Sequence, residues 1–175
     1  MRKSEKGRRG ILESQIWYKI IKEFNAFRIK YLLVGASAMA IYGIPRSTLD
    51  IDVYIEASSS SLKKLFQVAE KLKLETQQKD ILKISHQPDL FSNQWLSFSY
   101  KNQNILDVFL ADKKEFKRLY KNSKIKKDKT LKVRVASLED IIEMKKQTAR
   151  AVDLADIELI KEALRFMKKE KKCRE

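Results

Sequence analysis

Two aspartates stand two residues apart in a segment of alternating polarity. Asp50 and Asp52 belong to LDIDVYIE (residues 49–56), which predicts a half-buried strand with its apolar side chains, Leu49 among them, facing inward. Positions i and i+2 share one face about 7 Å apart, so the two carboxylates repel each other unless a cation lies between them. A divalent ion such as Mg²⁺ prefers carboxylate oxygens. The alternative is an ordinary strand whose acids face solvent.

A third aspartate lies inside a run that is otherwise apolar. Asp107 is the only charged residue in ILDVFL (residues 105–110). An ionised carboxylate is costly to bury unless it is paired or binds a metal. If this strand lies beside residues 49–56, three carboxylates converge, which is the arrangement that two-metal phosphoryl transfer requires. The alternative for Asp107 is an outward-facing position on its strand.

Small residues suited to phosphate binding come before the aspartates. KYLLVGA reads as a buried strand, and SAMAIYG reads as a short helix. Gly35 permits close approach of the backbone, and the start of the helix offers the free N–H groups of Ala36 and Ser37. Ser37 could also donate its hydroxyl, or it could serve only as the N-cap of the helix.

Two further residues precede the aspartates directly. Arg46 and Thr48 come just before Asp50 and would lie at the mouth of any site that the aspartates form. Arg46 could neutralise triphosphate charge, or it could be an ordinary surface arginine. Thr48 could contact the ligand, or it could only begin the strand.

A lysine falls on the apolar face of the helix predicted at about residues 137–149. Lys145 continues the stripe of apolar residues on that helix. An inward lysine needs a partner, which could be a ligand phosphate, a structural salt bridge, or solvent reached by its long side chain. Asp153 and Asp156 are typical of the N-cap and first turn of the last helix, and Arg150 could pair with either.

Helices and strands alternate around these residues. We expect helices at about residues 11–28, 59–73, 112–122, 137–149 and 153–168, and β structure over residues 80–110 with a hairpin turn at KNQN. This order predicts an α/β (α+β) fold, a small mixed β-sheet flanked by helices, with helices at the C-terminus. We expect a flexible basic segment at residues 1–10, one domain over residues 11–168 with a helical C-terminal part at about 137–168, and a charged tail at residues 169–175.

The composition favours a compact, basic protein. Of the 175 residues, 43% are hydrophobic. No stretch approaches the roughly 20 apolar residues that a membrane span needs. Because there is also no secretory signal and only one cysteine, we expect a cytoplasmic protein without membrane contact. The net charge of +15 predicts attraction to nucleic acid, nucleotide phosphates or an acidic partner. The alternative is a soluble, lysine-rich surface.

The densest basic segment lies between residues 112 and 134. It holds eleven Lys and Arg against three Asp and Glu, and it includes Phe116 and Tyr120. Such a segment could bind an acidic acceptor such as RNA, or it could be a solvated helix and loop. His86 is the only histidine and Cys173 the only cysteine, so we expect neither a zinc site nor an intramolecular disulfide.

These residues resemble the signature of the nucleotidyltransferase (polymerase-β-like) superfamily. That signature is a strand ending in glycine and a small residue, a short helix, Asp-x-Asp on the next strand, and a third aspartate on a later strand. Here it corresponds to GAS at residues 35–37, to Asp50 and Asp52, and to Asp107. The resemblance covers roughly residues 30–165. One departure is Ala36, where the superfamily usually has Gly or Ser.

Within the superfamily, the chain is similar to the minimal nucleotidyltransferases of bacteria and archaea, including the abortive-infection toxin type. VGASAMAIYGIPRSTLDIDVYI carries this likeness, together with SLEDIIEMKKQTARAVDLADIELI. The second segment supplies the inward lysine, an arginine and an Asp-Leu-x-Asp motif of those proteins, here Lys145, Arg150, Asp153 and Asp156.

The resemblance implies transfer of a nucleoside monophosphate from an NTP to an acceptor hydroxyl, with release of pyrophosphate. Mg²⁺ (or Mn²⁺) would be the cofactor. Asp50 and Asp52 would bind both metal ions, and Asp107 would bind the catalytic ion and could help deprotonate the acceptor. The implied partners are an NTP, an acceptor such as RNA or protein, and an antitoxin if the protein is a toxin. The alternatives are a non-catalytic nucleotide- or RNA-binding protein on the same fold, and a structural partner in a toxin–antitoxin pair.

Overall fold

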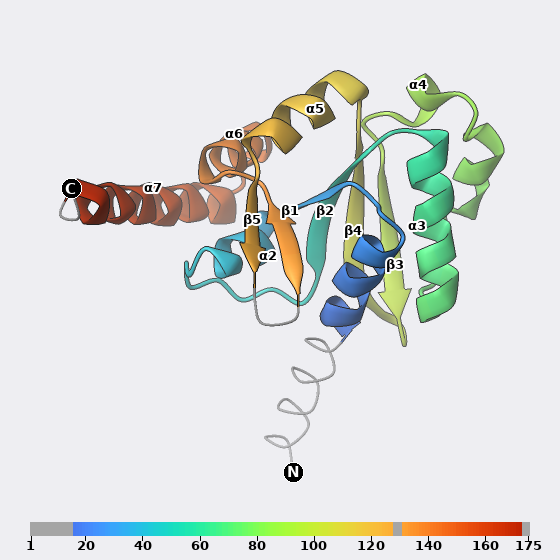
Figure 1. The fold of residues 1–175 in the computed structure, drawn as a ribbon, viewed down its shortest axis with the longest axis horizontal. Helices are drawn as coiled ribbons and strands as arrows, with labels where there is room; N and C mark the ends of the chain where they lie inside the picture. Colours follow the sequence, from blue (N-terminus) through green and yellow to red (C-terminus); the bar gives the residue numbers. More distant parts are fainter. Residues whose placement is uncertain (1–15, 128–130, 173–175) are drawn as a thin grey trace, which may run out of the picture.

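A six-stranded mixed sheet forms the centre of the protein (Figure 1). The computed structural model describes residues 16–127 and 131–172. The order of strands across the sheet is β3-β4-β2-β1-β6-β5. The strands are β1 (Tyr31–Val34), β2 (Ile51–Glu56), β3 (Trp95–Tyr100), β4 (Gln103–Ala111), β5 (Lys124–Lys127) and β6 (Lys132–Val135).

Helices flank the sheet and extend beyond one side of it. The first described helix covers residues 16–26. The others are α2 (Gly35–Ile41), α3 (Ser59–Leu72), the 3-10 helix η1 (Lys79–Ile84), α4 (Pro88–Phe91), α5 (Lys113–Asn122), α6 (Leu138–Thr148) and α7 (Ala151–Lys172). In Figure 1, α5 and α6 lie along one end of the sheet and α7 projects beyond it. The predicted fold class is confirmed. No helix in the described ranges is long and apolar enough to cross a membrane.

The core lies where the alternating strands meet amphipathic helices. In β2, Ile51, Val53 and Ile55 are at most 2% exposed, whereas the residues between them are half-buried. Leu62 and Leu65 of α3 belong to the same buried cluster. Burying a side chain of this size contributes about 1.5–3 kcal/mol. The inward face of β2 therefore anchors the strand, which leaves its other face available for the aspartates.

Strand β2 brings three parts of the chain together. It is antiparallel to β1, with Val34 opposite Asp52. It is also parallel to β4, with Asp52 opposite Asp107. The end of β1, the start of β2 and the middle of β4 therefore meet at one place in the sheet.

Strands β3 and β4 form the predicted hairpin, which contains a bulge. Lys101 and Asn102 form its two-residue turn, with φ angles of 52° and 61°, which is the backbone that a primed hairpin turn requires. The register then shifts between Phe98 and Ser99, because Ile105 is an extra residue in β4. A bulge re-aims the side chains that follow it.

The segment before this hairpin corrects one expectation. We expected β structure from residue 80 onward, but η1 and α4 occupy residues 79–84 and 88–91. Pro88 stands at the start of α4, where its missing N–H costs nothing and its fixed φ suits a helix. Ile81 and Phe91 are buried from these short helices. β structure therefore begins only at β3.

Two strands and one inward residue also differ from the sequence expectations. The sequence did not predict β5 and β6, and β5 is exposed along its whole length, so it has no apolar alternation to reveal it. Leu49 was expected to face inward, but it is 63% exposed because β2 begins only at Ile51.

The last helix is longer than expected. α7 runs from Ala151 to Lys172, so residues 169–172 of the expected charged tail are helical. Residues 173–175 and the expected flexible segment at residues 1–10 lie outside the described residues.

Replacing Leu49 tests its placement outside the sheet. Leu49→Ala is expected to change the free energy of unfolding by less than about 0.5 kcal/mol, because surface substitutions rarely do more. The same substitution at Leu106, which is fully buried in β4, should cost about 2–5 kcal/mol. Chemical denaturation measures both variants. Equal losses would contradict the exposed position of Leu49.

Candidate active site

Three predicted carboxylates lie together at the middle of the sheet. Asp52 on β2 and Asp107 on β4 are direct neighbours across a parallel strand pair, and both side chains are half-buried. Asp50 is also half-buried, but it was expected on the same strand as Asp52 and instead comes just before β2 begins. The structure thus brings together the three aspartates that the sequence singled out.

The electrostatics of Asp52 reflect this crowding. The pKa of Asp52 is raised to about 7, first by burial and then by the negative charges of Asp50 and Asp107. The positive charges of Lys145 and Arg150 act in the opposite direction. The cluster therefore has an excess of negative charge that the two nearby basic residues only partly offset.

Polar neighbours fix the orientation of two of the aspartates. The Thr48 hydroxyl donates to Asp50 Oδ1 at 2.6 Å. On β4, the Ser97 hydroxyl and the Asn104 amide both donate to Asp107 Oδ1, at 2.5 and 3.2 Å. The alternative that Thr48 only begins the strand is wrong, because β2 begins at Ile51. Contact between Thr48 and a ligand stays a prediction. Ser97 and Asn104 were missed, because only the bulged register places Ser97 opposite Asp107.

Residue 35 must be a glycine because its backbone lies close to the Asp52 side chain. Its φ is +64°, a left-handed backbone conformation that residues with a Cβ adopt at a cost of about 1–2 kcal/mol. A Cβ at this position would also overlap the Asp52 carboxylate, lying 2.9 Å from its Cγ. The end of β1 can therefore approach the aspartates only because residue 35 has no side chain.

The serine beside this glycine has a local partner. α2 begins at Gly35 with Val34 as its N-cap, so the alternative that Ser37 caps the helix is wrong. Ser37 is 4% exposed, and its hydroxyl donates to the Val34 carbonyl at 3.1 Å. Ala36 is half-buried next to it. Contact between this segment and phosphate stays a prediction.

A network of ion pairs lies beside the aspartates, between α6 and α7. Lys145 is 9% exposed, and its Nζ lies 3.1 Å from Asp153 Oδ1 and 2.7 Å from Asp156 Oδ2. Arg150 Nε is 2.7 Å from Asp153 Oδ2. Arg46 Nε is 3.0 Å from Asp156 Oδ1. Hydrogen bonding from Arg150 holds the pKa of Asp153 far below its usual value.

This network decides between the alternatives for its members. Lys145 makes structural salt bridges, which was one of its three expected roles, and phosphate contact by Lys145 stays a prediction. Asp153 lies in the first turn of α7 rather than at its N-cap. Asp153 and Asp156 are 1% and 2% exposed, so they serve as buried partners of the basic residues. Arg150 pairs with Asp153, as the sequence allowed.

The raised pKa of Asp52 predicts how stability depends on pH. In its folded state Asp52 holds a proton more tightly than in the unfolded chain, so its contribution to stability falls as pH rises from about 4 to about 7. With a metal chelator present, Asp52→Asn should be more stable than wild type at pH 8, by an amount on the order of a few kcal/mol. The difference should vanish near pH 4. Denaturation across this range measures it, and a difference independent of pH would contradict the shift.

The buried lysine predicts a large loss of stability. Lys145→Met leaves Asp153 and Asp156 buried without their shared partner, which should cost about 3–5 kcal/mol. The matched control is Lys161→Met, which removes an exposed pair with Glu158 and should cost no more than about 1 kcal/mol. Thermal or chemical unfolding measures both. Similar losses in the two variants would show that the network is not a buried anchor.

Proteins of known structure resemble this chain in fold, although they share little sequence with it. No curated protein matches the chain in sequence. An antigenic nucleotidyltransferase-like protein from Paracoccidioides brasiliensis has a similar structure, with 16% identity and a TM-score of 0.54 over 85% of this chain and 75% of that one. A candidate nucleotidyltransferase from Thermotoga maritima has 14% identity and a TM-score of 0.55 over 89% and 92%. At these identities the likeness shows the fold alone.

The family is shown by sequence. The sequence pattern of a family described as nucleotidyltransferase of unknown function (DUF6036) matches residues 18–165. That range contains all the aspartates, the Gly35 segment and the ion-pair network. The chain therefore belongs to this nucleotidyltransferase family.

Proposed function

We propose that the protein is a metal-dependent nucleotidyltransferase that moves a nucleoside monophosphate from an NTP to an acceptor hydroxyl. The observation that carries the proposal is the side-by-side placement of Asp52 and Asp107 on parallel strands, with Asp50 close enough to raise the pKa of Asp52. A stable fold has no need of three carboxylates there. Membership of a nucleotidyltransferase family supports the same reaction class.

The donor set suits a divalent cation. The three aspartates provide hard oxygen ligands of the kind that Mg²⁺ and Mn²⁺ prefer. In the described part of the chain, no three His, Cys, Asp or Glu side chains are placed so that they could hold a metal ion as they stand, so the proposal requires the aspartate side chains to turn towards the ion when it binds. The repulsion that raises the pKa of Asp52 would be relieved by a bound cation. The ions would polarise the phosphate and lower the pKa of the attacking hydroxyl.

The chain's own residues would then have distinct roles in one displacement. The acceptor oxygen bonds to the α-phosphorus, the bond from that phosphorus to the β-bridging oxygen breaks, and pyrophosphate leaves with the electron pair. Asp50 and Asp52 would hold the ions. Asp107, oriented through its Oδ1 by Ser97 and Asn104, would bind the catalytic ion and help remove the acceptor's proton.

Basic residues beside the aspartates favour a triphosphate. Arg150 is paired with Asp153, but its side chain is 70% exposed, so a ligand phosphate would have access to its guanidinium. Arg46 is 30% exposed and is held by Asp156. Both lie in the network whose charges reach Asp52. The backbone at Gly35 and Ala36 would complete the phosphate side.

The reaction can be tested directly with labelled nucleotides. Wild type is incubated with each α-labelled NTP, with Mg²⁺ or Mn²⁺, and with cellular RNA or protein as acceptor. We expect pyrophosphate release and a labelled acceptor. Asp52→Asn and Asp107→Asn should lower the rate by about 100-fold or more, since metal-ion catalysis contributes several kcal/mol. The matched control is Asp80→Asn, which alters an acid that is 87% exposed and should retain full activity.

Two outcomes would contradict the proposal. Nucleotide binding without pyrophosphate release, whichever NTP and metal are used, would favour a non-catalytic nucleotide-binding protein. Activity of Asp52→Asn and Asp107→Asn equal to that of wild type would remove the aspartates from the reaction.

A further inference from the structure

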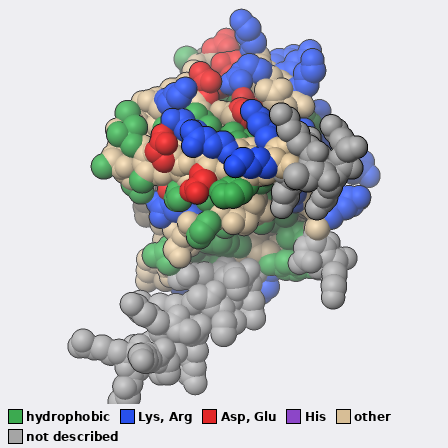
Figure 2. Space-filling model, turned by 90° about the vertical axis from the view of Figure 1, so that its left-hand side faces the viewer, with side chains coloured by type: hydrophobic (Ala, Val, Ile, Leu, Met, Phe, Trp, Pro, Cys, Tyr) green, Lys and Arg blue, Asp and Glu red, His purple; other side chains and the backbone are tan. Residues whose placement is uncertain are grey.

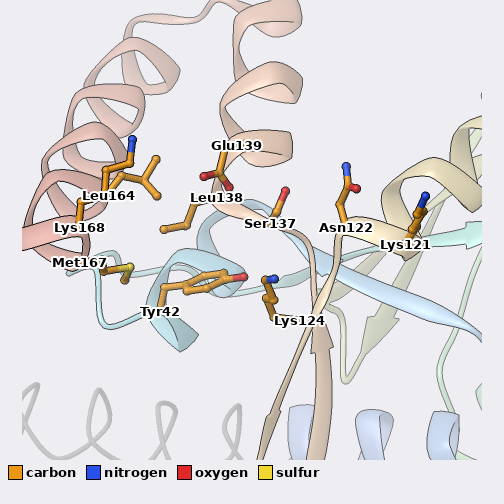
Figure 3. A pocket seen from close by; sticks show the side chains of 10 residues that line it. All are labelled: Tyr42, Lys121, Asn122, Lys124, Ser137, Leu138, Glu139, Leu164, Met167 and Lys168. Carbon is orange, nitrogen blue, oxygen red and sulfur yellow. The ribbon is translucent and has the colours of Figure 1, made fainter. Parts of the chain in front are cut away.

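A groove lies apart from the carboxylates, at the other end of α6. It has a volume of about 690 Å³, within the range of about 300–1,000 Å³ that is typical of ligand sites. It is bounded by the end of α2, the end of α5, the start of β5, the first turn of α6 and the C-terminal half of α7 (Figure 3). Eight residues along α6, or about 12 Å, separate Ser137 in this groove from Lys145 beside the aspartates.

Lysines from three elements converge on this groove. Lys121 of α5, Lys124 of β5 and Lys168 of α7 line it, against the single acid Glu139 (Figure 3). All three lysines are exposed, and none has an ion-pair partner among the residues that the structure describes. Space-filling Figure 2 shows Lys and Arg side chains gathered on the side of the molecule from which α7 projects. The groove therefore attracts a ligand with several negative charges.

The groove also has an apolar wall, formed by the ring of Tyr42 and the side chains of Leu164 and Met167. The Tyr42 hydroxyl donates to the Ala136 carbonyl at 2.9 Å, which fixes the ring in the groove. Burial is the main reason that the pKa of Tyr42 is raised to about 12, so the ring stays neutral. Leu164 and Met167 of α7 line the groove with it. A fixed ring beside apolar side chains suits a flat, uncharged group such as a nucleobase.

This groove also replaces the aromatic pair that the sequence suggested. Phe116 is 2% exposed, so it cannot stack on a ligand. Tyr120 is half-buried, and the Arg134 guanidinium lies 4.1 Å from its ring centroid. Tyr120 also lines a smaller hollow together with Tyr31. Tyr42 lines the larger groove, and the Lys126 Nζ lies 4.8 Å from its ring centroid.

We propose that this groove binds a segment of single-stranded nucleic acid. The phosphates would contact Lys121, Lys124 and Lys168, and a base would lie against Tyr42. A single-stranded nucleic acid is favoured over a mononucleotide because the basic surface continues along β5, where Lys126 and Lys127 are also exposed. A single strand is favoured over a duplex because the apolar wall can be used only by an unstacked base. Binding here does not depend on the nucleotidyl transfer proposed above.

The experiment measures binding and its dependence on salt. Fluorescence anisotropy follows the full chain binding labelled single-stranded RNA and DNA of about 12 nucleotides, a length suited to a short single-strand site. The test variant is Lys121→Gln/Lys124→Gln/Lys168→Gln. The control variant is Lys22→Gln/Lys63→Gln/Lys79→Gln, which removes the same charge from exposed lysines elsewhere. Unfolding midpoints check that both variants fold.

The proposal predicts a specific change in the salt dependence. For the test variant, the slope of log K against log salt concentration should become shallower by about 2, because each phosphate contact to a single strand contributes about 0.7. The control variant should keep most of the wild-type slope. If the control loses as much slope and affinity as the test variant, binding is spread over the whole basic surface and the proposal fails.

The aromatic wall is tested separately. Tyr42→Leu keeps an apolar side chain but removes the ring, and it should weaken binding by about tenfold, as expected for the loss of one stacked base. Tyr42→Phe keeps the ring without its hydroxyl and should bind almost as wild type does. An equal affinity of all three proteins would overturn the placement of a base in the groove.

Competitor molecules test whether the groove prefers a ligand other than a single-stranded nucleic acid. Displacement by a mononucleotide at equal concentration would indicate a small-nucleotide site. Displacement by polyglutamate or by duplex DNA as effective as by the single strand would indicate a general polyanion surface. Either result overturns the proposal. Asp52→Asn should bind the strand as wild type does, so strand binding can succeed or fail whether or not the chain transfers nucleotides.

Discussion

Repulsion among three carboxylates is the constraint around which this structure is arranged. Asp52 and Asp107 are held side by side because β2 and β4 are adjacent parallel strands, and neither can move away without disturbing the core face of its strand. The surrounding residues respond to this charge. Hydroxyl and amide groups orient the acids, Lys145 and Arg150 offset part of their charge, and residue 35 has no side chain where the Asp52 carboxylate needs space.

The positive charges beside the aspartates are in turn held by buried acids. Buried acids, Asp153 and Asp156, hold Lys145 and Arg46 in place. A buried lysine without such partners would lose its proton or draw water into the core. The network also ties α6, α7 and the loop before β2 to each other. The position of positive charge next to the aspartates is therefore set by the fold and does not depend on a flexible surface side chain.

The three aspartates could be singled out from the sequence because of the apolar residues around them. Asp50 and Asp52 alternate with apolar residues, although only Asp52 lies on the strand, and Asp107 is a lone charge in an apolar run. Other features left no such signal. β5 carries no apolar alternation. Counting back from the turn at Lys101 and Asn102 would place Ser97 opposite Leu106, and only the extra residue Ile105 moves it to Asp107. The partners of Lys145 depend on how α7 packs on α6, a long-range contact that periodicity does not encode.

Helix α6 forms part of both sites. Its first turn lines the lysine groove, and Lys145 near its last turn acts on Asp52. A helix of this length is nearly rigid along its axis, because each turn is hydrogen-bonded to the next. A displacement at one end is therefore passed to the other end. Thermodynamic linkage then requires reciprocity. Suppose that a nucleic acid bound in the groove changes the affinity of the aspartate site for nucleotide by some factor. Nucleotide bound at the aspartates must then change the affinity of the groove for that nucleic acid by the same factor.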